Sequence, residues 1–258
     1  MKYIDSHTHL YAGEFDADRE AVVQRAVHSG VSHLLLPAID SLYHKKLLDV
    51  VTHHPQLCYP MMGLHPTSVR ENYRDELTTV EKWLATPALK FYALGEIGID
   101  LYWDKTFDQE QRIVFKEQLR MAINHDLPAV IHTRNSMEIV LEIVEKENNS
   151  LLRGVFHCFN GNLDQARRAI SLGFYLGIGG VVTYKNSGLQ KIIETISPVH
   201  LLLETDAPWL PPVPYRGKRN ESSYLPLIAQ KIAEITNVSL ETVAEITTRN
   251  AKNLFKIS

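Results

Sequence analysis

The chain has 258 residues, of which 45% are hydrophobic and 22% are charged. This composition supplies a sizeable core and excludes a disordered or fibrous protein. The net charge of −3 excludes a surface coated in positive charge that would grip duplex DNA over a long footprint, so a nucleic-acid substrate would need a local basic rim or bound metal ions.

Short apolar runs alternate with amphipathic stretches along the whole chain. Eight runs have strand length and are continuously apolar, which is typical of strands buried on both faces. They cover residues 3–7, 31–37, 58–63, 91–95, 129–132, 154–156, 174–178 and 201–203. Apolar residues at helical spacing predict helices at 14–29, 40–53, 75–86, 108–125, 136–148, 162–171, 187–196, 221–236 and 239–254.

Two of the predicted helices carry start and stop signals. Asp108 begins one of them, and Pro128 lies beyond its end. Asn162 precedes another as a candidate N-cap, with Gly173 as a candidate residue just past its C-terminus.

Eight strands alternating with helices predict an α/β protein with a parallel sheet. Eight such strands in about 250 residues favour closure into a (β/α)8 TIM barrel, so we expect a single domain over residues 1–258. An open doubly wound sheet is the alternative, and it usually carries G-x-G-x-x-G after its first strand. Here the first predicted strand ends in His-Thr-His, and the glycines at 177–180 lie on the seventh predicted strand instead.

No signal for secretion or membrane insertion is present. The N-terminal MKYIDSHTHL lacks the apolar core of a signal peptide, and no stretch approaches the ~18 apolar residues of a transmembrane helix. The cysteines Cys58 and Cys158 are far apart and form no C-x-x-C motif, as in a reduced cytosolic protein. We therefore expect a cytoplasmic protein without a membrane partner. No heptad or exposed apolar stripe predicts a dimer, so we expect a monomer.

Histidines and carboxylates stand at the C-terminal ends of the predicted strands. In a parallel barrel these ends meet at one rim, where barrel active sites lie. Surface histidines have no reason to gather at strand ends, so the pattern predicts one pocket. Its members are His7, His9, His65, Glu96, His132, His157 and Asp206.

Individual members of this set carry different weight. His7 and His9 are separated by one residue, and side chains at i and i+2 on a strand point to the same side, so both can bind one ion. Asp206 leaves a buried strand, where a carboxylate is costly unless it is paired or bound to a metal. Taken alone, His132 and His157 fit a core histidine equally well, and Glu96 fits a buried carboxylate paired with an arginine.

Six of these residues form a candidate ligand set for divalent metals. Imidazole and carboxylate donors suit Zn²⁺, tolerate Mn²⁺ and suit Mg²⁺ less well. Six ligands exceed the needs of one tetrahedral ion with an open position, which predicts two ions bridged by Glu96. Two ions lower the pKa of a water and stabilise the attacking and leaving oxygens of a displacement at phosphorus. The ligands are His7, His9, Glu96, His132, His157 and Asp206.

Six ordered motifs resemble the TatD family of metal-dependent deoxyribonucleases, within the amidohydrolase-type barrels. They are DSHTHL, GEIGID, PAVIHTR, VFHCFNG, LLLETDAPWL and PYRGKRNE, and they run from residue 5 towards the C-terminus. The resemblance implies phosphodiester hydrolysis, often 3′-to-5′ exonuclease action on DNA. It also implies one ion on His7, His9, Glu96 and Asp206, a second on Glu96, His132 and His157, and a role for Asp206 in orienting or deprotonating the attacking water.

The match departs from the family pattern in two places. Family members often have Ser-Arg-Asp after the histidine of the fifth strand, where this chain has Thr133-Arg134-Asn135. After Asn220-Glu221 they often have a further Glu-Pro, where Ser222 and Ser223 stand here. Both departures lie outside the inferred ligands, and they leave the choice of substrate open.

Basic and aromatic residues in the predicted rim loops fit a phosphate-bearing substrate. Arg134, two residues after His132, is the best candidate for a phosphate clamp, and His65 is a candidate to contact substrate or to support the ligands. The other rim cations are Lys185, Arg216, Lys218 and Arg219, the last two interpreted as solvated loop residues. The rim aromatics, which either stack on bases of a single strand or pack the loops, are Tyr102, Trp103, Trp209 and Tyr215.

Three functions of different classes fit these residues. The first is a two-metal phosphodiesterase with Asp206 and Glu96 as catalytic residues, acting on DNA or another phosphodiester, most readily a single strand. The second is a barrel that hydrolyses a carboxylic ester or amide, such as the ester of an aminoacyl-tRNA. Many amidohydrolases place a modified lysine at the fourth strand, where this chain has Glu96, which favours the nuclease. The third is a non-catalytic binding protein, which the complete ligand set disfavours.

Overall fold

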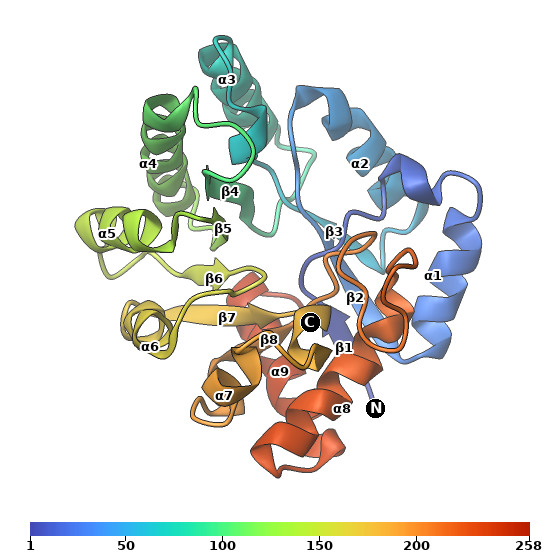
Figure 1. Cartoon of the computed structure of the whole chain (residues 1–258). Coiled ribbons are helices and arrows are strands. Elements are labelled where there is room, and N and C mark those ends of the chain that lie inside the picture. Colours follow the sequence, from blue (N-terminus) through green and yellow to red (C-terminus); the bar gives the residue numbers. More distant parts are fainter. The chain divides into compact units, whose positions relative to one another are not determined.

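The computed structural model describes residues 1–258, and its strands and helices alternate along the chain (Figure 1). The strands are β1 (Tyr3–Asp5), β2 (Val31–Leu36), β3 (Cys58–Pro60), β4 (Leu94–Asp100), β5 (Ala129–Arg134), β6 (Gly154–Phe156), β7 (Phe174–Ile178) and β8 (Leu201–Leu203). The helices are α1 (Arg19–His28), α2 (Ser41–His53), α3 (Tyr73–Leu84), α4 (Asp108–Asn124), α5 (Met137–Glu147), α6 (Leu163–Ser171), α7 (Leu189–Ile193), α8 (Leu225–Thr236) and α9 (Leu240–Phe255). Every predicted strand and helix is present.

The predicted ends of α6 are confirmed. The Asn162 side chain accepts a hydrogen bond from the backbone N–H of Gln165, and the Gln165 side-chain oxygen accepts one from the backbone N–H of Asn162, so the helix begins with a capping box. Gly173 follows the helix with a φ of +85°, the left-handed conformation that ends many helices. Asp108 begins α4 as predicted, without making a side-chain cap.

The predicted ends of four strands near the site were wrong. β3 ends at Pro60 rather than at residue 63, and β5 continues past His132 to Arg134. β4 starts at Leu94 and continues to Asp100, so Glu96 lies inside the strand rather than after it. The Gly-Glu pair interrupts the apolar run in the sequence, which suggested that the strand ends there. In the structure the strand continues through this pair, and all seven of its residues are buried. β1 ends at Asp5, so His7 and His9 lie in the segment beyond it.

The chain divides into two compact units. The first contains residues 1–36, 50–59 and 176–258, and the second contains residues 37–49 and 60–175. In the second unit β4, β5 and β6 pair in parallel, with Ile97 opposite Ile131 and Ile131 opposite Phe156. Helices α4, α5 and α6 follow these strands and pack side by side (Figure 1).

The first unit contains two parallel pairs, β1 with β2 and β7 with β8. Helix α9 packs against β1 and β8, and α8 packs against α9. A parallel bridge joins Thr8, beyond β1, to Ala207, beyond β8.

Strand order follows the chain, with β1-β2-β3 in one sheet and β4-β5-β6-β7-β8 in the other. Within the second unit a parallel bridge joins Met62, beyond β3, to Leu94 at the start of β4. Parallel strands that follow one another in chain order are the pattern of the predicted (β/α)8 barrel.

Gly98 allows β4 and β5 to approach at the site. Its φ is +144°, and a Cβ there would lie 2.0 Å from the carbonyl oxygen of His132. We expect Gly98→Ala to lower the free energy of unfolding by about 3 kcal/mol, because the backbone that carries His132 must shift. Urea denaturation followed by circular dichroism measures this loss.

Gly188→Ala is the matched control for this change. Gly188 also has a positive φ, +71°, but nothing lies within 4 Å of its missing Cβ. It should lose only the backbone preference, about 1 kcal/mol. Equal losses for the two variants would show that crowding against β5 is not what requires the glycine.

Candidate metal centre

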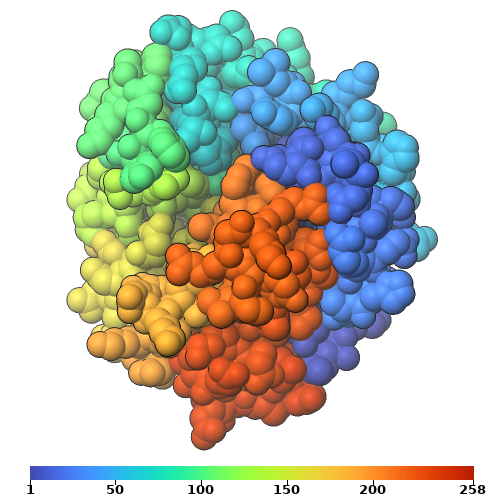
Figure 2. Space-filling view, turned by 45° about the vertical axis from the view of Figure 1, so that its right-hand side comes forward, coloured from blue at the N-terminus to red at the C-terminus, as the bar shows by residue number.

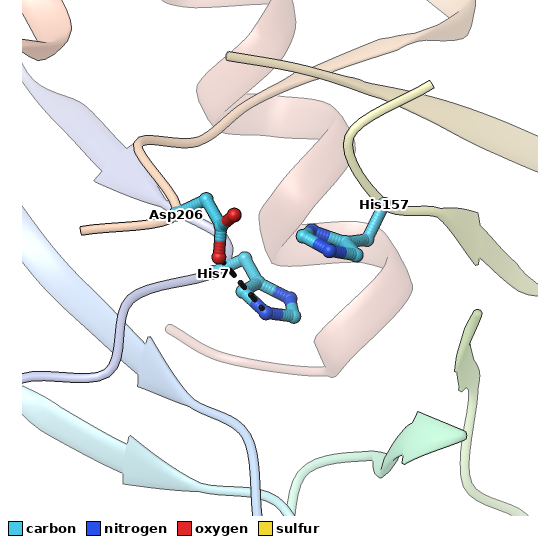
Figure 3. Close-up of side chains that lie close together, drawn as sticks. All are labelled: His7, His157 and Asp206. Atoms are coloured by element: carbon cyan, nitrogen blue, oxygen red, sulfur yellow. Dashed lines mark ion pairs between the residues drawn. The ribbon is translucent and has the colours of Figure 1, made fainter. Parts of the chain in front are cut away.

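Three donor atoms converge in the first unit. His7 Nε2 and His9 Nε2 lie 3.2 Å apart, and Asp206 Oδ1 lies 3.8 Å and 3.7 Å from them. Figure 3 shows the His7 ring and the Asp206 carboxylate turned toward one another. Both histidines are buried, whereas the Asp206 side chain is 14% exposed. The carboxylate is therefore the member of this group that water reaches.

Buried hydrogen bonds fix the position of Asp206 beside His7. The carboxylate of Asp5 accepts hydrogen bonds from the backbone N–H of Thr205 at 2.9 Å and from its hydroxyl at 2.6 Å. The backbone N–H of Asp206 donates to the carbonyl of His7 at 2.9 Å. Asp206 has a φ of +55°, in the left-handed region that aspartate enters more readily than most residues. Burial raises the pKa of Asp5 to about 7, despite the hydrogen bonds that lower it.

A second group of donors forms in the second unit around one carboxylate oxygen. Glu96 Oε1 lies 2.8 Å from His132 Nδ1 and 3.2 Å from both His65 Nε2 and His157 Nε2. Glu96 is only 3% exposed and stands on β4, while His157 directly follows β6. Three imidazole nitrogens thus surround a single buried oxygen.

His132 lies between two carboxylates. Its Nε2 is 3.0 Å from Asp100 Oδ2, and its Nδ1 faces Glu96. Burial lowers the pKa of His132, but the hydrogen bonds to Asp100 and Glu96 outweigh it and leave the pKa raised. This arrangement leaves one ring nitrogen for an ion while the other donates to a carboxylate, as in many metal-binding histidines.

Two glutamines of α4 hold the surrounding backbone. The buried side chain of Gln111 bonds the backbone N–H of Asp100 at 2.8 Å and its carbonyl at 3.2 Å. Gln118, two turns later on the same helix face, does the same for Leu64, at 2.7 Å and 3.0 Å. Because Leu64 precedes His65, one helix positions both the Asp100 and the His65 ends of the cluster.

His65 contacts the cluster in a tautomer of its own. The backbone N–H of Thr67 donates to His65 Nδ1 at 3.1 Å, so a neutral ring carries its proton on Nε2 and donates it to Glu96. His65 also stands with Glu96 and His132 in a group with metal-ligand spacing. In the tautomer that the Thr67 bond favours, however, it supports Glu96 rather than binding an ion.

The donor spacings fit divalent metal ions. Ligand atoms bound at ~2.0–2.2 Å to one ion lie about 3.0–3.6 Å from each other. The spacings of 3.2, 3.7 and 3.8 Å in the first cluster, and of 2.8 to 3.2 Å around Glu96, are close to this range. Nitrogen and carboxylate oxygen donors are those of Zn²⁺ and Mn²⁺.

Arg134, the residue predicted to bind phosphate, packs against two aromatic side chains. Arg134 ends β5, two residues after His132, and its guanidinium carbon lies 3.9 Å from the ring centroid of Tyr102 and 5.1 Å from that of Trp103. No ion pair involves Arg134, and the side chain of Trp103 is 70% exposed. Arg134 thus keeps its charge available to an anion, beside two exposed rings.

The other predicted rim residues divide between packing and exposure. Arg219 pairs with Asp18 at 2.7 Å, so it is a structural residue, while Lys218 is exposed. Tyr215 stacks on Tyr224 with ring centroids 4.0 Å apart, and Trp209 packs edge-on against His9. Lys185 and Arg216 line a cavity.

The departures from the family pattern have structural roles. Asn135 has a φ of +54°, which asparagine and aspartate both adopt readily, so the turn after β5 is kept. The Ser223 hydroxyl donates to Glu221, which in turn binds Arg25 at 2.6 Å. Ser222 lies 3.5 Å from the hydroxyl of Thr8.

Sequence reasoning therefore located both clusters and missed their supports. His7, His9 and Asp206 come together in the first unit, and Glu96, His132 and His157, with His65, in the second. Asp100 was missed, although it ends the GEIGID motif four residues after Glu96 and so faces the same side of the strand. Asp5 and the two glutamines were missed because nothing in the sequence distinguishes them from ordinary strand and helix residues.

Known proteins are similar to this chain over nearly its whole length. Residues 4–256 match the model of the family described as TatD related DNase. The metal-dependent hydrolase YabD of Bacillus subtilis is 36% identical over 98% of this chain and 99% of its own. The 3′-5′ ssDNA/RNA exonuclease TatD of Erwinia tasmaniensis is 30% identical over 98% of this chain and 99% of its own. The crystal structure of the TatD homologue YjjV of Escherichia coli superposes with a TM-score of 0.93, at 30% identity, over 99% of this chain and 98% of that one.

The chain therefore belongs to the TatD family. Its fold is the predicted (β/α)8 barrel, and it is a metal-dependent hydrolase whose histidine and carboxylate clusters fit metal ions. No α-helix is long and apolar enough to cross a membrane.

Asp100 provides a test of the second cluster. We expect Asp100→Asn to weaken metal binding about 10- to 100-fold, because the ring of His132 loses the carboxylate that orients it. Titration of metal-stripped protein with Zn²⁺ or Mn²⁺ against a competing chelator measures the affinity. Asp104→Asn, in the loop after β4 and 44% exposed, is the control and should bind as the native protein does. An unaltered affinity in Asp100→Asn would remove Asp100 from the site.

Proposed function

We propose that the protein is a two-metal phosphodiesterase that shortens single-stranded nucleic acid from its 3′ end. The observation that carries the proposal is the pair of histidine and carboxylate clusters, each with donor spacings close to those around a divalent ion. The relative named as a 3′-5′ ssDNA/RNA exonuclease supports the choice of substrate. Hydrolysis of a carboxylic ester or amide is the outcome to test against it.

In this proposal the two clusters form one centre. The C-terminal ends of all strands in a (β/α)8 barrel meet at one rim, which is the physical reason to join residues of β4, β5 and β6 with those beyond β1 and β8. His7, His9 and Asp206 would hold one ion, His132 and His157 would hold the other, and Glu96 would be a ligand shared by both. Zn²⁺, Mn²⁺ or Mg²⁺ would supply a Lewis acid and an ionised water there.

The chain's own residues then have separate tasks. Bound divalent ions supply a water that ionises near neutral pH and compensate charge at the phosphate. Asp206, the partly exposed carboxylate of its cluster, accepts a proton from the attacking water. The water oxygen bonds to phosphorus, the bond from phosphorus to the leaving nucleoside oxygen breaks, and that oxygen takes a proton from solvent. Arg134 holds a non-bridging phosphate oxygen, and His65 keeps Glu96 in place.

The remaining parts of the proposal concern substrate form and setting. Tyr102 and Trp103 are exposed rings beside Arg134, and base stacking on such rings suits unpaired strands. Two cysteines in 258 residues suit a reducing compartment, so we place the protein in the cytoplasm. We propose that it acts as a monomer.

Asp206→Asn tests the assigned base. We expect turnover of single-stranded DNA labelled at its 5′ end to fall about 100- to 10,000-fold, the usual range for a lost general base. Metal-stripped protein should be inactive and regain activity with Mn²⁺, Zn²⁺ or Mg²⁺, giving a ladder that shortens from the 3′ end. Asp75→Asn, an exposed residue of α3, is the matched control.

The outcomes test the identity of the general base and the class of substrate separately. Near-native turnover by Asp206→Asn would show that another group accepts the proton. A protein that binds about two ions but cleaves no DNA with any metal would contradict the nuclease function. The same protein would then be assayed on aminoacyl esters.

Arg134→Gln tests the phosphate clamp. We expect kcat/KM for single-stranded DNA to fall about 10- to 100-fold, the equivalent of one charge-assisted hydrogen bond of ~1.5–3 kcal/mol. Arg74→Gln is the control, because Arg74 also lies over a tyrosine ring, that of Tyr73, but on the exposed surface of α3. If both variants lose equal activity, the effect is one of overall charge and Arg134 is not a clamp.

A further inference from the structure

We propose a second anion subsite, outside the metal clusters, that binds a backbone phosphate of the nucleic-acid strand. It is a cavity of about 580 Å³ between the loops after β7 and β8, lined among others by Lys185, Asn186, Ser187 and Arg216. None of the metal-ligand candidates lines it. The identity of the strand as ligand rests on the proposed function, whereas the affinity for phosphate does not.

The charge of the cavity favours an anion. Its lining contains two cations, Lys185 and Arg216, and no carboxylate. Neither cation forms an ion pair, and both are exposed. Elsewhere in the same unit Arg219 pairs with Asp18, and Arg25 pairs with Glu221. In a protein of net charge −3, two unneutralised cations at one hollow are an unusual local excess of positive charge.

Hydrogen bonds between the two loops hold the cavity open. The hydroxyl of Tyr184 donates to the carbonyl of Pro211 at 2.7 Å. The hydroxyl of Thr183 donates to Gly180 at 2.7 Å and accepts from the backbone N–H of Val213 at 2.9 Å. A ligand would therefore meet a wall that is already formed, which lowers the entropy cost of binding.

A glycine lets the two loops approach. A Cβ on Gly180 would lie 2.3 Å from the carbonyl oxygen of Leu210 and 2.8 Å from the nitrogen of Pro212. The backbone of the segment after β7 therefore packs directly on that after β8. This contact and the hydrogen bonds make the two loops one rigid surface, part of which Figure 2 shows as the orange segment after β8.

The orientation of Arg216 suits a phosphate. Its guanidinium carbon lies 4.4 Å from the ring centroid of Tyr184, so the group is supported by a ring that is itself hydrogen-bonded. A guanidinium held in this way presents its N–H groups to two oxygens at once, which matches phosphate geometry. Phosphate sites in (β/α)8 barrels frequently form at the loops after the seventh and eighth strands.

The test is binding of fluorescein-labelled single-stranded DNA by the metal-loaded full chain carrying Asp206→Asn, which slows cleavage during the measurement. In this background we expect Lys185→Gln with Arg216→Gln to raise Kd about tenfold, measured by fluorescence anisotropy. The slope of log Kd against log salt should fall by ~0.7, since one phosphate contact is lost and each contributes ~0.7 for a single strand. Thermal unfolding of the variant should stay close to that of the parent, because both side chains are exposed and neither forms an ion pair.

The matched control removes the same charge elsewhere. Lys45→Gln with Lys46→Gln, two exposed residues of α2 that form no ion pair, should leave Kd and the salt slope almost unchanged. Equal loss in the two double variants would overturn the subsite, because it would reduce the effect to net charge. An unchanged Kd in the cavity variant would overturn it as well.

Two further measurements distinguish a backbone phosphate of the strand from free inorganic phosphate as the ligand. With oligonucleotides of decreasing length, the difference between cavity variant and parent should shrink, because a short strand cannot occupy both the metal centre and the cavity. A difference that is independent of length, with displacement of the probe by inorganic phosphate from the parent alone, would overturn the strand as ligand and leave free phosphate. These readings need no turnover, so an absence of DNA cleavage by the native protein would contradict the proposed function without deciding the subsite.

Discussion

One buried carboxylate oxygen, Oε1 of Glu96, imposes the main constraint on this structure. Three imidazole nitrogens face it within 3.2 Å while the side chain is 3% exposed. Such a concentration of polar groups away from water is expensive, and a metal ion repays the cost because it replaces solvent as the partner of each donor. The buried glutamines of α4 and the glycine at 98 have the same purpose, since each keeps the backbone beside these donors in one position.

The first cluster meets the same constraint by another route. Here the supporting group is Asp5, whose carboxylate receives both the hydroxyl and the N–H of Thr205 and so holds the turn that presents Asp206. The left-handed backbone at Asp206 turns its carboxylate away from the strand direction and leaves it partly exposed. In the proposed mechanism a proton acceptor needs contact with water, whereas histidines that bind an ion do not. The difference in exposure within this cluster is therefore consistent with the separate tasks proposed for Asp206 and for the two histidines.

The architecture could be predicted from the sequence because the strands and helices of a (β/α)8 barrel leave regular hydrophobic patterns along the chain. Each buried parallel strand is a continuous apolar run, and polar side chains stand near its C-terminal end, so position alone predicted that His7, His132, His157 and Asp206 belong to the clusters. Glu96 was placed after its strand rather than within it, since a polar residue inside a run looks like its end. His65 was found, but its preference for the tautomer that donates to Glu96 depends on the Thr67 backbone, which no spacing reveals. The roles of Asp5, Gln111 and Gln118 depend on hydrogen bonds to the backbone of other segments. Such contacts cannot be predicted from the pattern of a single sequence.

The distribution of paired and unpaired cations links the site to an anionic substrate. Most arginines here neutralise a neighbouring carboxylate, as Arg25, Arg120 and Arg168 do. Arg134, Lys185 and Arg216 form no ion pair. Arg134 ends β5, Lys185 and Arg216 lie in the loops after β7 and β8, and both arginines pack on an aromatic ring. Leaving a cation unpaired costs little folding stability, because a surface ion pair would contribute at most about 1 kcal/mol. Keeping its charge uncompensated does raise its attraction for phosphate. An acidic protein can therefore bind a nucleic-acid strand through a few placed cations, without the overall positive charge that its composition excludes.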